Sequence, residues 1–141
     1  MPEPAWTRRF PREVGALDSI FEFVREFLQR EGLRGDGAFE ADLVLEELFT
    51  NLVRHNRGRE PIEIALGRSD GDLLLTLRDF DVEPFDPTQF ARLEDAEAAD
   101  TSPGGRGIVL VLRMTKEFRY DYRDRTSTLT ARLAWRGEHP A

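Results

Sequence analysis

The chain has 141 residues, with 20 Lys or Arg, 27 Asp or Glu, two His, no Cys and a formal net charge of −7 at pH 7. This length predicts a single domain over residues 1–141, and the acidic balance argues against direct binding to nucleic acid. The lack of cysteine excludes disulfides, thiolate metal sites and a cysteine nucleophile. The N-terminus is not basic, and no apolar run approaches the ~18 residues of a membrane span, so we expect a cytoplasmic protein without a membrane partner.

The first half of the chain predicts one short strand and two helices. Residues from Trp6 to Pro11 alternate in character and end at a proline, as an edge strand does. Apolar residues then recur three and four positions apart from Val14 to Arg30 and again from about Phe39 to His55. This spacing is typical of one-sided amphipathic helices, and the second one should stop at Asn56-Arg57-Gly58.

The second half predicts two hairpins separated by a long loop and a short helix. The loop, from Asp81 to Gly105, is acidic and contains three prolines, so it should be a functional lid or disordered. The other expected elements are strands at Ile62–Leu66 and Leu73–Leu77, a helix at Gly107–Thr115, and strands at Phe118–Tyr120 and Leu129–Trp135. The order predicts an α+β two-layer sandwich, with helices on one face of a mixed, mostly antiparallel sheet.

Three polar side chains form a stripe on the second helix. Glu47, Asn51 and His55 are spaced by four residues and border its apolar face. A carboxylate, a carboxamide and an imidazole in register offer a general base, an oxygen ligand for Mg²⁺ and a hydrogen-bonding neighbour, as phosphoryl transfer requires. The alternative is an ordinary solvated helix face.

Two further features could contact a nucleotide. Asp79 shares the inward parity of Leu73, Leu75 and Leu77, so its carboxylate should accept a hydrogen bond from an adenine amine and be satisfied only when ligand or water is present. The alternative is an exposed aspartate at a strand end. The glycine cluster around Arg106 precedes a helix and could cradle phosphates, although it could also be a hinge; its glycines are Gly104, Gly105 and Gly107.

Together these segments resemble the GHKL ATPase superfamily. Residues Leu43 to His55 look like its N box, Leu77 to Pro87 are similar to its first glycine box, and Gly104 to Val111 to its second. The likeness covers nearly the whole chain. The Glu-Leu-Phe-Thr-Asn form of the N box and the Pro-Phe-Asp-Pro sequence before the lid are most similar to bacterial anti-sigma-factor serine kinases, which have the Bergerat ATP-binding fold.

The resemblance implies a role for each matching residue. Asn51 would bind Mg²⁺, Glu47 would be the general base, and Asp79 would read the adenine amine. His55 would lie in the nucleotide site, and the phosphates would be held at the end of an ATP lid that spans about residues 81–105, by Gly104, Gly105, Arg106 and Gly107.

The chain departs from the resemblance in the first glycine box. Asp81 stands where the superfamily usually has a glycine, and its charge near a triphosphate could weaken ATP binding by repulsion. A hydroxyl of the last strand also contacts adenine in many relatives, and the sequence leaves Ser127 and Thr128 equally plausible.

The function that the resemblance implies is that of an ATP- and Mg²⁺-dependent anti-sigma factor. It would phosphorylate a serine or threonine of a STAS-type anti-anti-sigma partner, would sequester a sigma factor when that partner is unavailable, and could form a homodimer. Its lid should become ordered when nucleotide binds. One alternative is a nucleotide-binding regulatory module of the same fold without phosphotransfer. Another is a detached histidine-kinase ATPase domain, which the chain does not favour because it has no dimerisation helix with a phosphoacceptor histidine.

Overall fold

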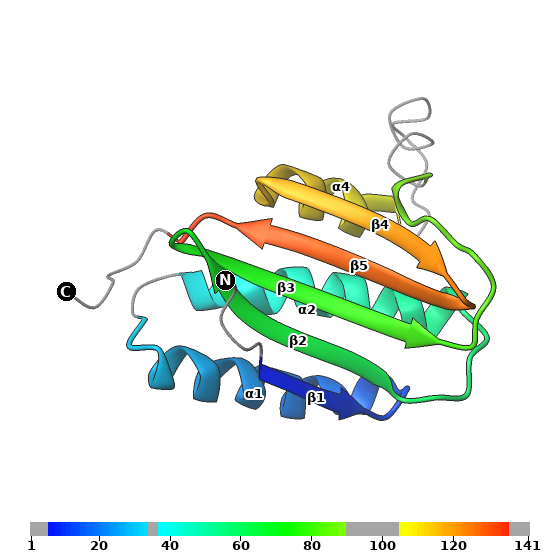
Figure 1. The fold of residues 1–141 in the computed structure, drawn as a ribbon, viewed down its shortest axis with the longest axis horizontal. Coiled ribbons are helices and arrows are strands. Elements are labelled where there is room, and N and C mark those ends of the chain that lie inside the picture. Colours follow the sequence, from blue (N-terminus) through cyan, green and yellow to red (C-terminus); the bar gives the residue numbers. More distant parts are fainter. Residues whose placement is uncertain (1–5, 34–36, 90–104, 136–141) are drawn as a thin grey trace.

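A five-stranded sheet packs against a layer of helices in this computed structural model (Figure 1). The structure describes residues 6–33, 37–89 and 105–135. The elements are β1 (Trp6–Phe10), η1 (Val14–Ala16), α1 (Leu17–Arg30), α2 (Gly37–His55), β2 (Ile62–Ser69), β3 (Asp72–Phe80), α4 (Gly105–Met114), β4 (Glu117–Arg123) and β5 (Thr126–Leu133). The strand order is β1-β2-β3-β5-β4, and every pairing within the described parts of the chain is antiparallel. The predicted α+β two-layer architecture is confirmed.

Most element boundaries lie close to those predicted. The first helix is the main difference, because Val14–Ala16 forms a 3₁₀ turn and the α-helix begins at Leu17. Val14 is 56% exposed, so it adds nothing to the apolar face that the periodicity assigned to it. The strands β2, β3 and β4 are longer than their apolar cores, since backbone pairing continues into the polar residues that flank them. Most of the predicted lid, residues 90–104, lies outside the described residues.

The core lies between the sheet and the two long helices. Each helix turns one apolar face to the sheet, and alternate residues of β2, β3 and β5 point back at it. Full burial of each leucine or phenylalanine here contributes roughly 1.5–3 kcal/mol. The largest fully buried side chains are Phe23, Phe49, Ile20, Leu45, Leu48, Ile62, Ile64, Leu66, Leu73, Leu75, Leu77 and Ile108.

Two tight turns join the antiparallel pairs. Asp70 and Gly71 link β2 to β3, and Asp124 and Arg125 link β4 to β5; all four have positive φ. Such two-residue turns match the right-handed twist of the strands, and aspartate and glycine tolerate this conformation best. The second turn places Arg125 beside the segment that follows β3.

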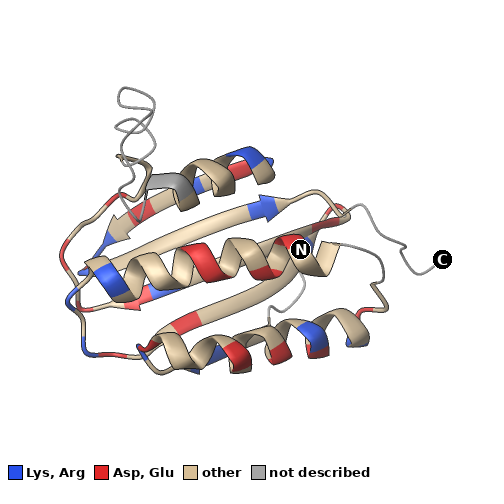
Figure 2. Cartoon of the chain, turned by 180° about the vertical axis from the view of Figure 1, so that it is seen from behind, with Lys and Arg blue, Asp and Glu red and all other residues tan. Residues whose placement is uncertain are grey.

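Charge is distributed over the helix layer. In Figure 2, which views the molecule from behind, α1 carries both acidic and basic residues, whereas α2 carries acidic residues along its length and a basic residue in its last turn. Among the described residues, no helix is both long and apolar enough to span a membrane.

Candidate functional site

The C-terminal half of α2 carries the polar stripe predicted from the sequence. Asn51 is only 3% exposed, and among the described residues its amide nitrogen has no hydrogen-bond partner. Glu47 and His55 are half-buried on either side of it. The stripe therefore faces the interior at the margin of the core, and the solvated-face alternative does not describe it.

Glu47 lies directly against the first turn of α4. A Cβ atom at Gly107 would overlap the Oε2 atom of Glu47, so any larger residue there would force this carboxylate to move. Burial, reinforced by the charge of Glu46 and opposed by that of Arg54, raises the pKa of Glu47 above its ordinary value. A carboxylate with a raised pKa is a stronger proton acceptor than an exposed one. The N-box helix and the second glycine box thus meet at this contact.

His55 packs face to face with Phe85 from the segment after β3. The ring centroids are 5.2 Å apart and the planes are inclined by 12°. Burial and the neighbouring charge of Arg54 lower the pKa of His55, so the imidazole is neutral at pH 7. The pair joins the end of α2 to the start of the predicted lid.

Asp79 is fully buried at the end of β3, as its parity predicts. One part of the prediction is wrong, however, because the carboxylate is satisfied without a ligand. Its Oδ1 atom accepts a hydrogen bond from the guanidinium of Arg12, and its Oδ2 atom accepts one from Asn56 Nδ2 at 2.7 Å. The cause is the segment after β1, which carries Arg12 to the same end of the sheet.

The register between β3 and β5 separates the two hydroxyl candidates. Ser127 is paired with Asp79, is 1% exposed, and has an Oγ atom without a hydrogen-bond partner within the described parts of the chain. Thr128 is paired with Arg78 and is only half-buried. Since cross-strand partners project to the same face of a sheet, Ser127 is the hydroxyl that accompanies Asp79.

Asp81, which stands where the first glycine box usually has a glycine, lies in a region of φ that favours glycine. Its φ is +55°, in the left-handed region, which aspartate enters more readily than most residues. Arg125 Nε donates to its carboxylate at 2.8 Å, and Arg125 Nη1 donates to Glu83 at 3.1 Å. Asp81 therefore adopts a positive φ without being a glycine, and Arg125 pairs with its acidic charge.

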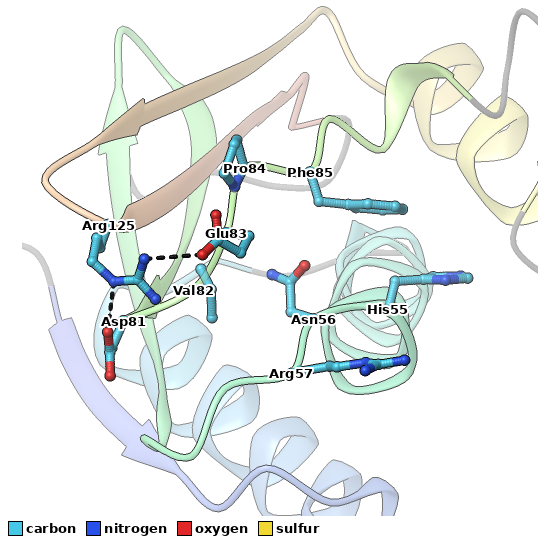
Figure 3. A pocket seen from close by; sticks show the side chains of 9 residues that line it. All are labelled: His55, Asn56, Arg57, Asp81, Val82, Glu83, Pro84, Phe85 and Arg125. Carbon is cyan, nitrogen blue, oxygen red and sulfur yellow. Dashed lines mark hydrogen bonds and ion pairs between the residues drawn. The ribbon is translucent and has the colours of Figure 1, made fainter.

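The segment from Val82 to Phe85 is fixed by β4. Tyr122 donates its hydroxyl hydrogen to the Val82 carbonyl at 2.6 Å, and the Phe85 amide donates to the Tyr120 hydroxyl at 2.9 Å. A cavity of about 370 Å³ opens beside this segment, and Figure 3 shows Asn56 at its centre with the stacked rings on one flank. It is lined by His55, Asn56, Arg57, Asp81, Val82, Glu83, Pro84, Phe85 and Arg125.

The remaining candidates belong to the glycine cluster. Gly105, Arg106 and Gly107 form the first turn of α4, where backbone N–H groups are free of intrahelical partners. The side chain of Arg106 and the whole of Gly104 lie outside the described parts, so their predicted contacts stay predictions.

Sequence reasoning missed two residues that hold Asp79. Arg12 follows the predicted edge strand directly, and no local sequence pattern links it to a carboxylate 67 positions away. Asn56 gave a weak signal, since an asparagine just after a helix usually serves to end it.

Comparison with known protein families identifies the domain to which the chain belongs. Residues 10–133 match the histidine kinase-like ATPase domain family, and the chain belongs to that family. The predicted resemblance to the GHKL superfamily is therefore confirmed. A comparison with curated protein sequences gave no match.

Solved structures share the fold at low sequence identity. The RsbU and RsbW domains of Rv1364c from Mycobacterium tuberculosis align with a TM-score of 0.67 at 16% identity, over 99% of this chain and 34% of that one. The SiaB–SiaC complex from Pseudomonas aeruginosa aligns with a TM-score of 0.62 at 16% identity, over 91% and 88%. The Acinetobacter baumannii histidine kinase AdeS aligns with a TM-score of 0.54 at 12% identity, over 95% and 70%. This chain thus spans about a third of the Mycobacterium tuberculosis chain.

Proposed function

We propose that this protein binds ATP with Mg²⁺ and phosphorylates a serine or threonine of a STAS-type partner, acting as an anti-sigma factor that releases or sequesters a sigma factor. The observation that carries the proposal is the contact between Glu47 and Gly107, which brings the N box against the start of α4. The motif resemblance supplies the class of substrate. SiaB was solved in a complex with SiaC, and we extend a protein partner to this chain by analogy.

The described residues fit a magnesium nucleotide. Asn51 and Ser127 each leave a buried polar atom without a partner within the described ranges, and such atoms are costly unless a ligand or water satisfies them. Asn51 also offers the oxygen type that Mg²⁺ prefers. Within the described residues, no cluster of three His, Cys, Asp or Glu could hold a metal alone. This suits Mg²⁺, which is usually held by one or two side chains together with substrate phosphates.

Each side chain then has a distinct task. Asn51 would hold Mg²⁺. His55, which stacks on Phe85, would line the nucleotide site one helical turn further along α2. Asp79 would accept the hydrogen bond of the adenine amine, and Ser127 would contact the base beside it. The amides of Gly104, Gly105 and Gly107, with the side chain of Arg106, would hold the phosphates at the N-terminal end of α4. When bound, Mg²⁺ neutralises charge on the phosphate oxygens.

Glu47 would act as the general base for the partner's hydroxyl. Glu47 lies against Gly107 in the first turn of α4, where we expect the terminal phosphate to bind, and this contact supports the role. Because burial raises its pKa, the carboxylate accepts a proton more readily than a surface glutamate. Phosphotransfer should fall as the pH drops and this carboxylate becomes protonated.

The test is phosphotransfer from labelled ATP to candidate STAS-domain proteins. Glu47→Gln should lower the transfer rate about 10²–10⁴-fold, because it removes the base, while ATP affinity by calorimetry changes little. Glu40→Gln on the same helix is the matched control and should behave like the parent.

Three other results would contradict the proposal or one of its assignments. A parent protein that binds ATP but phosphorylates no candidate would favour the nucleotide-binding module without phosphotransfer. A parent that binds no ATP at all would overturn both readings. If Glu47→Gln transferred phosphate as fast as the parent, Glu47 would not be the base.

A further inference from the structure

We infer that Arg12, assisted by Asn56, is the positioning residue of the base subsite: it fixes the Asp79 carboxylate as a hydrogen-bond acceptor before any nucleotide arrives and thereby selects a purine with an amino group at the 6-position. The inference rests on the proposed nucleotide site and concerns how that site discriminates between bases.

The first observation is that both oxygens of the buried Asp79 carboxylate accept a hydrogen bond from the protein itself. Its side chain is 0% exposed, and Arg12 and Asn56 each donate to a different oxygen. The Arg12 side chain is itself only 12% exposed. A carboxylate oxygen has two lone pairs, so both oxygens keep accepting capacity after these bonds are made. The two donors therefore fix the orientation of the carboxylate, and its oxygens can still accept a further hydrogen bond.

The second observation is the close packing of other residues around the guanidinium of Arg12. Arg12 Nη1 donates to the carbonyl of Leu52 at 3.3 Å, next to Asn51 on α2. A Cβ atom at Gly58 would lie 2.5 Å from Arg12 Nη2 and 2.8 Å from Val82 Cγ1. Space for the guanidinium thus depends on a glycine, and one guanidinium links the end of α2 to the end of β3.

The third observation is the side from which Arg12 arrives. In the sheet, β3 lies between β2 and β5, and Arg12 follows β1 beyond β2. Ser127, whose Oγ has no partner within the described residues, projects from β5 on the other side. In Figure 1, α4 also lies on the β5 and β4 side. Arg12 therefore approaches Asp79 from the flank opposite α4, and the base would contact Asp79 from the flank of Ser127.

This arrangement has a consequence for recognition. A buried carboxylate without a cationic partner is strongly unfavourable, and Arg12 offsets that cost in the free protein. The acceptor is then preorganised, so little ordering remains when a base binds. An amino group at the purine 6-position would donate to Asp79, whereas a 6-oxo group would place one acceptor against another. The ligand class is thus a 6-aminopurine nucleotide.

The test compares two ligands in parent and variant. Calorimetry with Mg²⁺ measures the affinity of ATP and of purine riboside triphosphate, which lacks the 6-amino group. We expect the parent to prefer ATP by about ten- to a hundredfold, because the missing hydrogen bond is made to a charged group. Arg12→Met should reduce this preference to below about threefold, with most of the loss falling on ATP. A residue with only a structural role would weaken both ligands equally.

Two further variants keep the test decisive. Asn56→Ala removes the other donor to Asp79 and should lower the ATP preference in the same way, even if Arg12→Met does not fold. Arg25→Met removes a surface arginine paired with Asp42 at 2.6 Å and should leave the preference unchanged. If Arg12→Met and Asn56→Ala both leave the ratio of the ATP affinity to the purine riboside triphosphate affinity unchanged, the inference is overturned. The proposed function would remain intact. A parent that binds neither ligand would instead overturn the proposed function.

Discussion

Individual residues in left-handed backbone shape the entrance to the candidate site. Asp81 and Arg125 both have positive φ, at 55° and 58°, and Arg125 Nε donates to the Asp81 carboxylate. The Val82 amide also donates to the Arg125 carbonyl at 3.0 Å. Two strained residues therefore support each other across the gap between the β4–β5 turn and the segment after β3.

This conformation makes Asp81 sensitive to branching at Cβ. Asp81→Val should lower the free energy of unfolding by about 1–2 kcal/mol, because a β-branched residue is poorly tolerated at positive φ. Asp81→Gly should be more stable than Asp81→Val, by at least about 1–2 kcal/mol in the free energy of unfolding. Denaturant unfolding measures both. The control is Asp121→Val on the exposed face of β4, where valine suits a strand. Equal stability of Asp81→Val and the parent would show that the turn relaxes.

At the scale of the elements, sequence periodicity predicted most of the fold. The apolar stripe of α2 and the alternation of β2 and β3 specify which faces are buried, so Asn51 and Asp79 could be placed at the margin of the core. The partners of Asp79 could not be predicted, because Arg12 reaches it through tertiary packing of β1 against β2. Likewise, only the β3–β5 register distinguishes Ser127 from Thr128.

A second charged junction joins β3 and β5 to the residue that precedes β4, at the other end of the sheet. Asp72, at the start of β3, accepts hydrogen bonds from Lys116 Nζ at 2.9 Å and Arg132 Nε at 2.8 Å. The hydrogen bond from Lys116, followed by that from Arg132, lowers the pKa of Asp72 below its ordinary value of 3.8 despite partial burial. The junction lies at the opposite end of β3 from Asp79 and offers a separate test of the packing between β3 and β5.

The lowered pKa of Asp72 predicts a pH dependence of stability. Because the native state binds this proton more weakly than the unfolded state does, the stabilisation is present above pH 3.8 and is lost as the pH falls through the lower native value. In denaturant unfolding, the parent should be more stable than Asp72→Asn at pH 6, and the two should converge below pH 3.8. Asp70→Asn changes a side chain that is 94% exposed and should follow the parent. Parallel curves for parent and Asp72→Asn would contradict the assignment.

For the molecule as a whole, folding and ligand binding share the same contacts. The amide nitrogen of Asn51 and the hydroxyl of Ser127, which have no hydrogen-bond partner among the residues that the structure describes, come from opposite layers, one from α2 and one from the sheet. The Glu47 contact adds α4 to the same junction. A nucleotide that made hydrogen bonds to these groups would bind only the folded chain. Its binding should therefore raise the free energy of unfolding of the whole domain.

The last prediction follows from that linkage. Mg²⁺–ATP at about a hundred times its dissociation constant should add about 2.7 kcal/mol to the stability, which raises the Tm of a domain this size by about 10 °C. Asn51→Ala should keep a folded parent-like Tm without ligand, because the side chain borders the core without filling it, but it should lose most of the Mg²⁺-dependent rise. Thr50→Ala, one residue away and bonded only to the carbonyls of its own helix among the contacts of the described chain, should retain the rise. Differential scanning calorimetry with and without Mg²⁺ measures these shifts, and a full shift in Asn51→Ala would remove Asn51 from the metal site.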